Sequence, residues 1–188
     1  MEIHSFLQPA AGGIGIVAYI ILIISLIKSK AEQSFAAFLL WAMLDLIATI
    51  TSVLEDGNYW LPMSNVIGSS LITILLIMKK QISWSRIETM TTLLVIICLI
   101  VWYVAGEQAG IIASSLAGVI ASIPQMVETY RRPNATPIVA YFVFLGANIV
   151  SFFAGKSWTI EERFYSTCSV FLCLVIVLLA IRRHSKLH

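Results

Sequence analysis

The sequence predicts an all-α polytopic membrane protein with seven transmembrane helices, arranged as two parallel three-helix bundles joined by a linker helix. Long apolar runs, charges confined between them and an internal repeat predict this fold. Of the 188 residues, 59% are apolar and 12% charged, whereas soluble domains are about half apolar and a quarter charged. A bilayer core of roughly 30 Å needs about 20 apolar residues per helix. The expected spans lie near residues 10–27, 34–54, 60–78, 87–105, 108–128, 137–155 and 162–181.

The second half of the chain repeats the first. Moving it back by 103 positions, the separation of Lys28 and Arg131, aligns the halves without a gap. Asn148 then falls on Asp45. Other matches are Gly118 with Gly15, Ala121 with Ala18, Leu174 with Leu71, and Arg182–Arg183 with Lys79–Lys80. An internal repeat fixes architecture, and in an apolar chain it is typical of transporters built from two copies of one bundle.

The first apolar run is read as a span and not as a signal peptide, because it lacks a basic leading segment and has a counterpart in the second half. Residues 1–82 hold the first three-helix repeat, 83–106 the linker helix, and 107–188 the second repeat with a short basic tail. Three spans carry the chain across the membrane, and the linker returns it. The two repeats are therefore expected to be parallel, related by an axis along the membrane normal.

Positive charge is confined to alternate loops. The other loops hold only Lys156 and Arg163, beside acidic residues such as Glu107. Lys and Arg are retained in the cytoplasm, so we expect the N-terminus outside and the C-terminus in the cytoplasm. The absence of targeting signals favours a bacterial inner membrane, and the basic residues are topology signals rather than a nucleic-acid site. The basic loops contain Lys28, Lys30, Lys79, Lys80, Arg86, Arg131, Arg132, Arg182, Arg183 and Lys186.

A proline and a glutamine lie about one turn before the cytoplasmic end of the fifth span. Pro124 removes a helix hydrogen bond and predicts a kink. The amide of Gln125 could satisfy a backbone carbonyl that the kink frees, since such groups need partners inside the protein in lipid. This pair is a candidate hinge or gate, with a static kink as the alternative.

Pro124-Gln125, a basic turn and then Pro137 at the start of the sixth span resemble the PQ-loop motif. With the three-one-three helix order and an external N-terminus, the chain resembles the PQ-loop and SWEET-like transporter superfamily over nearly its whole length. That superfamily includes sugar exporters, lysosomal amino-acid exporters and ER-retrieval receptors. The resemblance implies that prolines of both repeats gate the cytoplasmic side, Pro137 among them.

The first repeat departs from this pattern. The positions that match Pro124, Gln125 and Pro137 hold Ile21, Leu22 and Ser34. Any gating motion is therefore expected to be asymmetric and carried mainly by the second repeat.

Asp45 is the one acidic side chain well inside a predicted span. A carboxylate there costs several kcal/mol unless it is protonated, paired or hydrated, and such residues face the bundle interior. Phe38 and Trp41 share its helix face. Two such stripes would line a central solute pocket, with plain packing as the alternative. The matching stripe of the sixth span is Tyr141, Phe144 and Asn148.

The resemblance also implies solute-binding asparagines in the third and seventh spans. Asn65 fills the first place, but its counterpart in the repeat is Cys168, so the second asparagine is missing. The alternative for Asn65 is an interhelical tie worth on the order of 1 kcal/mol. Asp45 is also a candidate proton site that could couple transport to protons.

We expect neither enzymatic function nor a bound cofactor or metal. The seventh span lacks the lysine that a retinal protein needs, and one buried aspartate cannot form a protease pair. We expect a transporter in the lipid bilayer that moves a small polar solute, an amino acid or a sugar, by alternating access. The alternatives are a ligand or sorting receptor of the same fold, or a scaffold subunit. The sequence leaves the solute and the existence of a homo-oligomer open.

Overall fold

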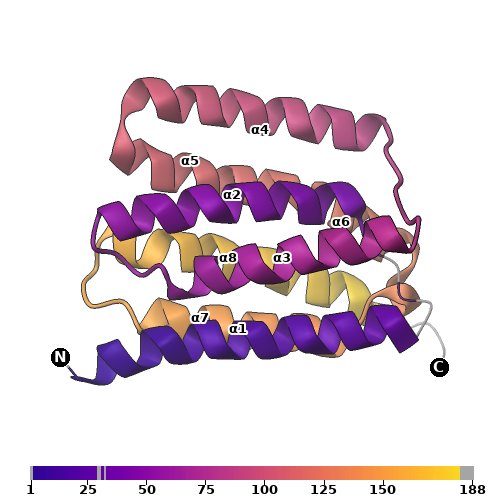
Figure 1. Ribbon diagram of the computed structural model, residues 1–188, viewed down its shortest axis with the longest axis horizontal. Coiled ribbons are helices and arrows are strands. Elements are labelled where there is room, and N and C mark those ends of the chain that lie inside the picture. Colours follow the sequence, from indigo (N-terminus) through magenta and orange to yellow (C-terminus); the bar gives the residue numbers. More distant parts are fainter. Residues whose placement is uncertain (1, 29–30, 32, 183–188) are drawn as a thin grey trace.

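A computed structural model describes residues 2–28, 31 and 33–182, and that part of the chain is helical with no strand (Figure 1). The helices follow the predicted spans closely. One predicted span, the fifth, is divided into two helices. The α-helices are α1 (Glu2–Lys28), α2 (Phe35–Leu54), α3 (Trp60–Met78), α4 (Arg86–Ala105), α5 (Glu107–Ala121), α6 (Ile123–Arg131), α7 (Ile138–Phe153) and α8 (Ile160–Ile181), and the 3-10 helix η1 (Pro133–Ala135) precedes α7.

Local signals explain where several helices begin. The side chain of Ser34 accepts a hydrogen bond from the backbone N–H of Ala37 and caps α2. Ser85 and Glu88 form a reciprocal capping box at the start of α4. Each satisfies backbone N–H groups that the first turn of a helix leaves unpaired.

Among the described residues, six helical segments are long and apolar enough to cross a membrane: Phe6–Lys28, Phe35–Leu54, Trp60–Met78, Arg86–Ala105, Gln108–Arg131 and Ile160–Ile181. Many large apolar side chains on them are exposed, Met78 at 75% among them, as expected of a surface in contact with lipid. These features are those of a multi-pass integral membrane protein.

The sixth predicted span is shorter than expected. The sequence predicts a helix over 137–155, whereas α7 has 16 residues, or about 24 Å at 1.5 Å per residue. Pro137 lies just before its first turn. Arg163 donates hydrogen bonds to the backbone carbonyl of Phe152 in its last turn and to that of Gly155 just after the helix. These contacts end the helix before the apolar sequence does.

The fifth predicted span is interrupted where the sequence predicts a kink. Ser122 separates α5 from α6, and Pro124 is the second residue of α6. Proline has no N–H to donate into the preceding turn. The backbone N–H of Ser122 contacts the carbonyl oxygens of both Gly118 and Val119, a tightened turn at the end of α5.

The helices pack in pairs that the sequence repeat relates to one another. In the first half, α3 packs against both α1 and α2; in the second half, α8 packs against α5 and α6 on one side and α7 on the other. Between the halves, α1 packs against α7 and α2 packs against α5 (Figure 1). The 103-residue shift relates α1 to α5 and α6, and α2 to α7. It therefore converts the α1–α7 contact into the α2–α5 contact and the reverse. The remaining helix, α4, packs mainly against α5 at the edge (Figure 1).

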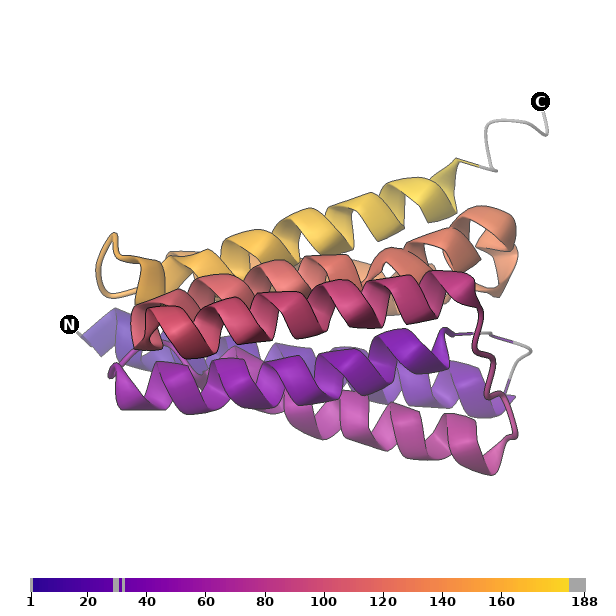
Figure 2. The same ribbon diagram turned by 90° about the horizontal axis from the view of Figure 1, so that it is seen from above.

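Helix α1 begins and helix α8 ends at opposite ends of the bundle (Figures 1 and 2). Helices α1, α3, α5 and α8 run in one direction, and α2, α4 and α7 run in the other. The end where α8 finishes also holds Lys28, Lys79 and Arg131. We call it the basic end. The predicted basic residues Lys30, Arg183 and Lys186 lie outside the described residues.

Candidate functional site

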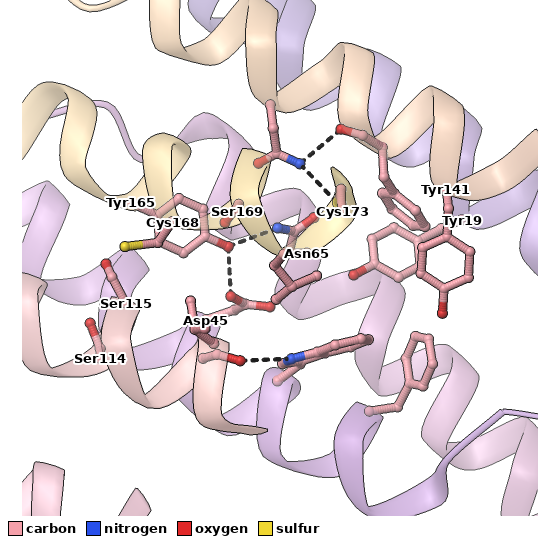
Figure 3. A pocket seen from close by; sticks show the side chains of 17 residues that line it. Tyr19, Asp45, Asn65, Ser114, Ser115, Tyr141, Tyr165, Cys168, Ser169 and Cys173 are labelled. Carbon is pink, nitrogen blue, oxygen red and sulfur yellow. Dashed lines mark hydrogen bonds between the residues drawn. The ribbon is translucent and has the colours of Figure 1, made fainter. Parts of the chain in front are cut away.

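A cavity of about 60 Å³ lies between the two halves of the molecule (Figure 3). Its lining comes from α1, α2, α3, α5, α7 and α8. At roughly 15 Å³ per water molecule, it has room for about four waters or one solute of that size.

The structure brings the predicted solute residues together around this cavity. Asp45 and Asn148, which the repeat relates, both line it, with exposed fractions of 9% and 3%. Phe38 lines it as well. The other predicted residues in the lining are Trp41, Asn65, Tyr141 and Phe144. Their role in binding a solute stays a prediction.

A hydrogen-bond chain links the two halves at one wall of the cavity. Asn65 Nδ2 donates to the hydroxyl oxygen of Tyr165 at 2.7 Å, and the Tyr165 hydroxyl donates to Asp45 Oδ1 at 2.6 Å (Figure 3). Asn65 on α3 is therefore an interhelical tie and a cavity residue at the same time. The tyrosine fixes the orientation of the carboxyl group from the opposite half.

Two buried polar atoms of the lining have no hydrogen-bond partner: Asn148 Oδ1 and Ser115 Oγ. The amide nitrogen of Asn148 is engaged, because it donates to the carbonyl oxygen of Phe144 at 2.8 Å and to the sulfur of Cys173 at 3.7 Å. The amide oxygen is left as an acceptor. An unsatisfied buried polar group costs about 1–3 kcal/mol, so such atoms mark a place where a ligand or water binds.

Aromatic rings form much of the remaining wall. The ring centroids of Tyr19 and Phe144 are 4.6 Å apart at an edge-on angle, and those of Phe38 and Trp41 are 4.8 Å apart. The indole nitrogen of Trp41 donates to the carbonyl oxygen of Gly118 at 3.2 Å, which holds α2 against α5. These contacts leave a rigid apolar wall beside the polar groups.

The predicted gate residues lie at the basic end of the cavity. Gln125 is wholly buried, and its Oε1 accepts a hydrogen bond from the backbone N–H of Ser34 at 2.8 Å. Its Nε2 donates to the hydroxyl of Thr129 at 3.3 Å. The prediction that Gln125 satisfies a freed backbone carbonyl is therefore wrong. Its amide instead holds the start of α2, because that N–H has no partner within the helix.

A second hydrogen bond between the halves lies beside this one. The hydroxyl of Tyr141 donates to Gln33 Oε1 at 2.6 Å. Tyr141 lines the central cavity, whereas Gln33 and Ser34 line a larger vestibule of about 360 Å³ at the basic end, together with Pro124. The pair thus separates the two spaces. Pro137 is at the start of α7, one turn before Tyr141.

Hydrogen bonds also join the halves at the other end. Asn58 Nδ2 donates to the hydroxyl of Ser151 at 3.1 Å, and Gln8 Nε2 donates to Glu162 Oε2 at 3.1 Å. All four side chains are buried. Polar contacts therefore join the halves on both sides of the cavity, at the basic end and at the opposite end.

Several residues of the lining were not predicted from the sequence as site residues. Tyr165 is the most consequential, and its counterpart in the repeat is Pro62, so the repeat carries no signal for it. Its spacing of four residues from Ser169 on one helix face is the pattern that could have indicated it. The other such residues are Tyr19, Ser114, Ser115, Gly118, Val119, Cys168, Ser169, Leu172 and Cys173.

No known protein family, curated protein or solved structure matches the chain.

Proposed function

We propose that this protein is a membrane transporter that moves a small polar solute by alternating access. The carrying observation is the cavity between the two halves, where the Asp45 carboxyl, the unpartnered Asn148 Oδ1 and the unpartnered Ser115 Oγ lie together. Ionisable residues within spans are costly and are kept for function. A solute site near mid-membrane at the interface of two repeats is typical of secondary transporters.

We propose further that the seven spans form two parallel three-helix bundles with α4 as the linker, in the manner of the PQ-loop and SWEET-like superfamily. The matched contacts α1–α7 and α2–α5 support this arrangement. So does the position of Pro124 and Gln125 at the bend between α5 and α6. On this proposal the basic end faces the cytoplasm of a bacterium and the N-terminus lies outside.

Alternating access requires that the contacts at the two ends open in turn. At the basic end the gate would be the Gln33–Tyr141 and Ser34–Gln125 hydrogen bonds. At the other end it would be the Asn58–Ser151 and Gln8–Glu162 pairs. Rocking of one half against the other would break one set while the other holds.

Asp45 is the proposed proton site. The titratable side chains that share its cavity are Tyr19, Tyr141, Tyr165, Cys168 and Cys173, and a carboxylic acid is the strongest acid among these groups. If Asp45 exchanges protons during the cycle, Asp45→Asn should remove any acceleration of uptake by a pH gradient. Uptake by Asp45→Asn that keeps its full pH dependence would rule out this role.

Uptake into proteoliposomes tests the transport function. The purified protein is reconstituted, and vesicles preloaded with pools of amino acids, sugars or small amines are exposed to the labelled members of each pool. Saturable exchange of one pool, absent from protein-free vesicles, is expected. A solute that binds the protein but never crosses the bilayer would indicate a receptor, and the transport proposal would then be abandoned.

A further inference from the structure

The polar groups that line the cavity offer a solute more hydrogen-bond acceptors than nitrogen donors. Each side-chain nitrogen of its asparagines and tryptophan makes at least one hydrogen bond within the protein: Trp41 Nε1 to Gly118, Asn65 Nδ2 to Tyr165, and Asn148 Nδ2 to Phe144. The groups that remain for a solute are mainly acceptors: Asn148 Oδ1 and the carboxyl of Asp45, with the hydroxyl of Ser115 able to accept or donate. The site is therefore prepared for a solute that donates hydrogen bonds.

The charged groups of the lining also favour a solute that donates hydrogen bonds. Among the described residues that line the cavity, Asp45 is the only carboxyl group, and none is Lys, Arg or His. A charge transferred from water into an apolar interior needs an opposite charge close by. A solute cation finds that partner in Asp45, whereas a solute carboxylate finds no cation and meets a second carboxylate.

The surrounding rings add to this preference. Phe38, Trp41, Tyr141 and Phe144 line the same space. The face of an aromatic ring carries negative electrostatic potential and attracts cations, by about 0.5–2 kcal/mol in known cases. Packing alone would account for the aromatic walls. It would not account for a carboxyl group that lies among them without a cationic partner.

Resting on the transport function proposed above, we propose that the cavity selects a small organic ammonium ion: a primary amine with one positive charge and no carboxylate. The ammonium group donates to Asp45 and to Asn148 Oδ1, and Ser115 Oγ accepts from the ammonium or a neighbouring hydroxyl. The volume of about 60 Å³ limits the solute to a few non-hydrogen atoms, which excludes a hexose from this conformation.

A series of probes with similar size and different charge tests the proposal. Ethanolamine is a cation, ethylene glycol is neutral, glycolate is an anion and glycine is a zwitterion. Binding of each to the purified full-length protein in detergent is measured by titration calorimetry near pH 7. Ethanolamine should bind at least about tenfold more tightly than the other three, the lower range of couplings between close desolvated charges.

Two carboxylate variants on the same helix sharpen the test. Asp45→Asn keeps the size of the side chain and an acceptor for Tyr165, and it should remove the preference for ethanolamine. Glu55→Gln removes an exposed carboxylate at the end of α2 and should leave the preference unchanged. The four probes test the proposal on the unaltered protein without either variant. The proposal therefore stays falsifiable even if a variant fails to fold.

The outcomes separate this inference from the transport function. Equal or tighter binding of ethylene glycol, glycolate or glycine would overturn the ammonium proposal, and so would the absence of ethanolamine binding, even if vesicles take up a sugar. Ethanolamine that binds selectively but is not transported would support the ammonium site and contradict the transporter.

Discussion

Tyr165 connects the two halves at the level of single atoms. Its hydroxyl accepts from Asn65 on α3 and donates to Asp45 on α2. Among the residues that the structure describes, neither partner's side chain makes another hydrogen bond across the cavity. The orientation of the acidic group therefore depends on one phenol from the opposite repeat.

Tyr165→Phe should lower the free energy of unfolding by about 0.6–2 kcal/mol, the range for interhelical hydrogen bonds in membranes. The change removes the hydroxyl and keeps the ring, so packing is preserved. Denaturant unfolding in detergent measures the change in the free energy of unfolding. Tyr103→Phe is the control, because Tyr103 is 89% exposed. Equal free energies of unfolding for the two variants would show that the Tyr165 hydroxyl does not contribute to stability.

Gln125→Leu places in the second repeat the residue that the first repeat carries at Leu22. It leaves the backbone N–H of Ser34 buried without an acceptor, which should cost about 1–3 kcal/mol. Gln108→Leu is the matched control, because Gln108 is exposed and its hydrogen bond to Glu161 lies at the surface. That control should stay within about 0.5 kcal/mol of the unaltered protein. A Gln125→Leu protein as stable as Gln108→Leu would contradict the role given to this amide.

Site residues were predictable where the repeat marks them. Asp45 and Asn148 occupy matching positions with an aromatic stripe before each, and the structure places both at the same cavity. Tyr165 was not predictable in this way, because Pro62 stands at its counterpart. The partner of Gln125 could not be predicted either, because it is a backbone N–H on another helix and only the packing of α2 against α6 determines it.

At the scale of the helix, Pro124 is the second residue of α6 and directly follows the interruption at Ser122 that ends α5. Pro124→Ala restores a backbone N–H that can donate into the preceding turn and so should join α5 to α6. We expect the fold to be kept or stabilised, by up to about 3 kcal/mol, and the rate of solute exchange to fall. Circular dichroism and exchange into proteoliposomes measure the two effects.

Pro9→Ala is the control for this change, because Pro9 also lies inside a helix, α1, and does not line the cavity. Its exchange rate should match that of the unaltered protein. Unchanged exchange by Pro124→Ala would reduce the bend to a static feature of the helix.

The positions of the helices were largely predictable because apolar length and charge limits determine them. The end of α7 was not. The predicted span continues to residue 155, but Arg163 from the next helix donates to the carbonyl of Phe152 in the last turn of α7 and to that of Gly155 just after it. A contact of this kind has no signature in the local sequence. The start of α1 at Glu2 also precedes the predicted span, since Pro9 is tolerated within it.

For the whole molecule, the repeat relates the contacts α1–α7 and α2–α5 but not the hydrogen bonds beside the vestibule. Gln125 pairs with Ser34, whereas the matching residues Leu22 and Pro137 have neither the amide nor the N–H to form that bond. The two halves are therefore alike in helix packing and unlike at the basic end. This difference is the physical basis for expecting asymmetric gating.

Access to the cavity from each side of the membrane tests the central claim most directly. Ser115→Cys, in a chain whose Cys98, Cys168 and Cys173 are replaced by alanine, is treated with a membrane-impermeant thiol reagent in right-side-out and in inside-out vesicles. Ser122→Cys is the control, since Ser122 is wholly buried and does not line the cavity. Labelling of Ser115→Cys from both sides, with Ser122→Cys unlabelled, is the predicted result. Labelling from one side only, or from neither, would contradict a solute site that opens alternately to the two faces of the membrane.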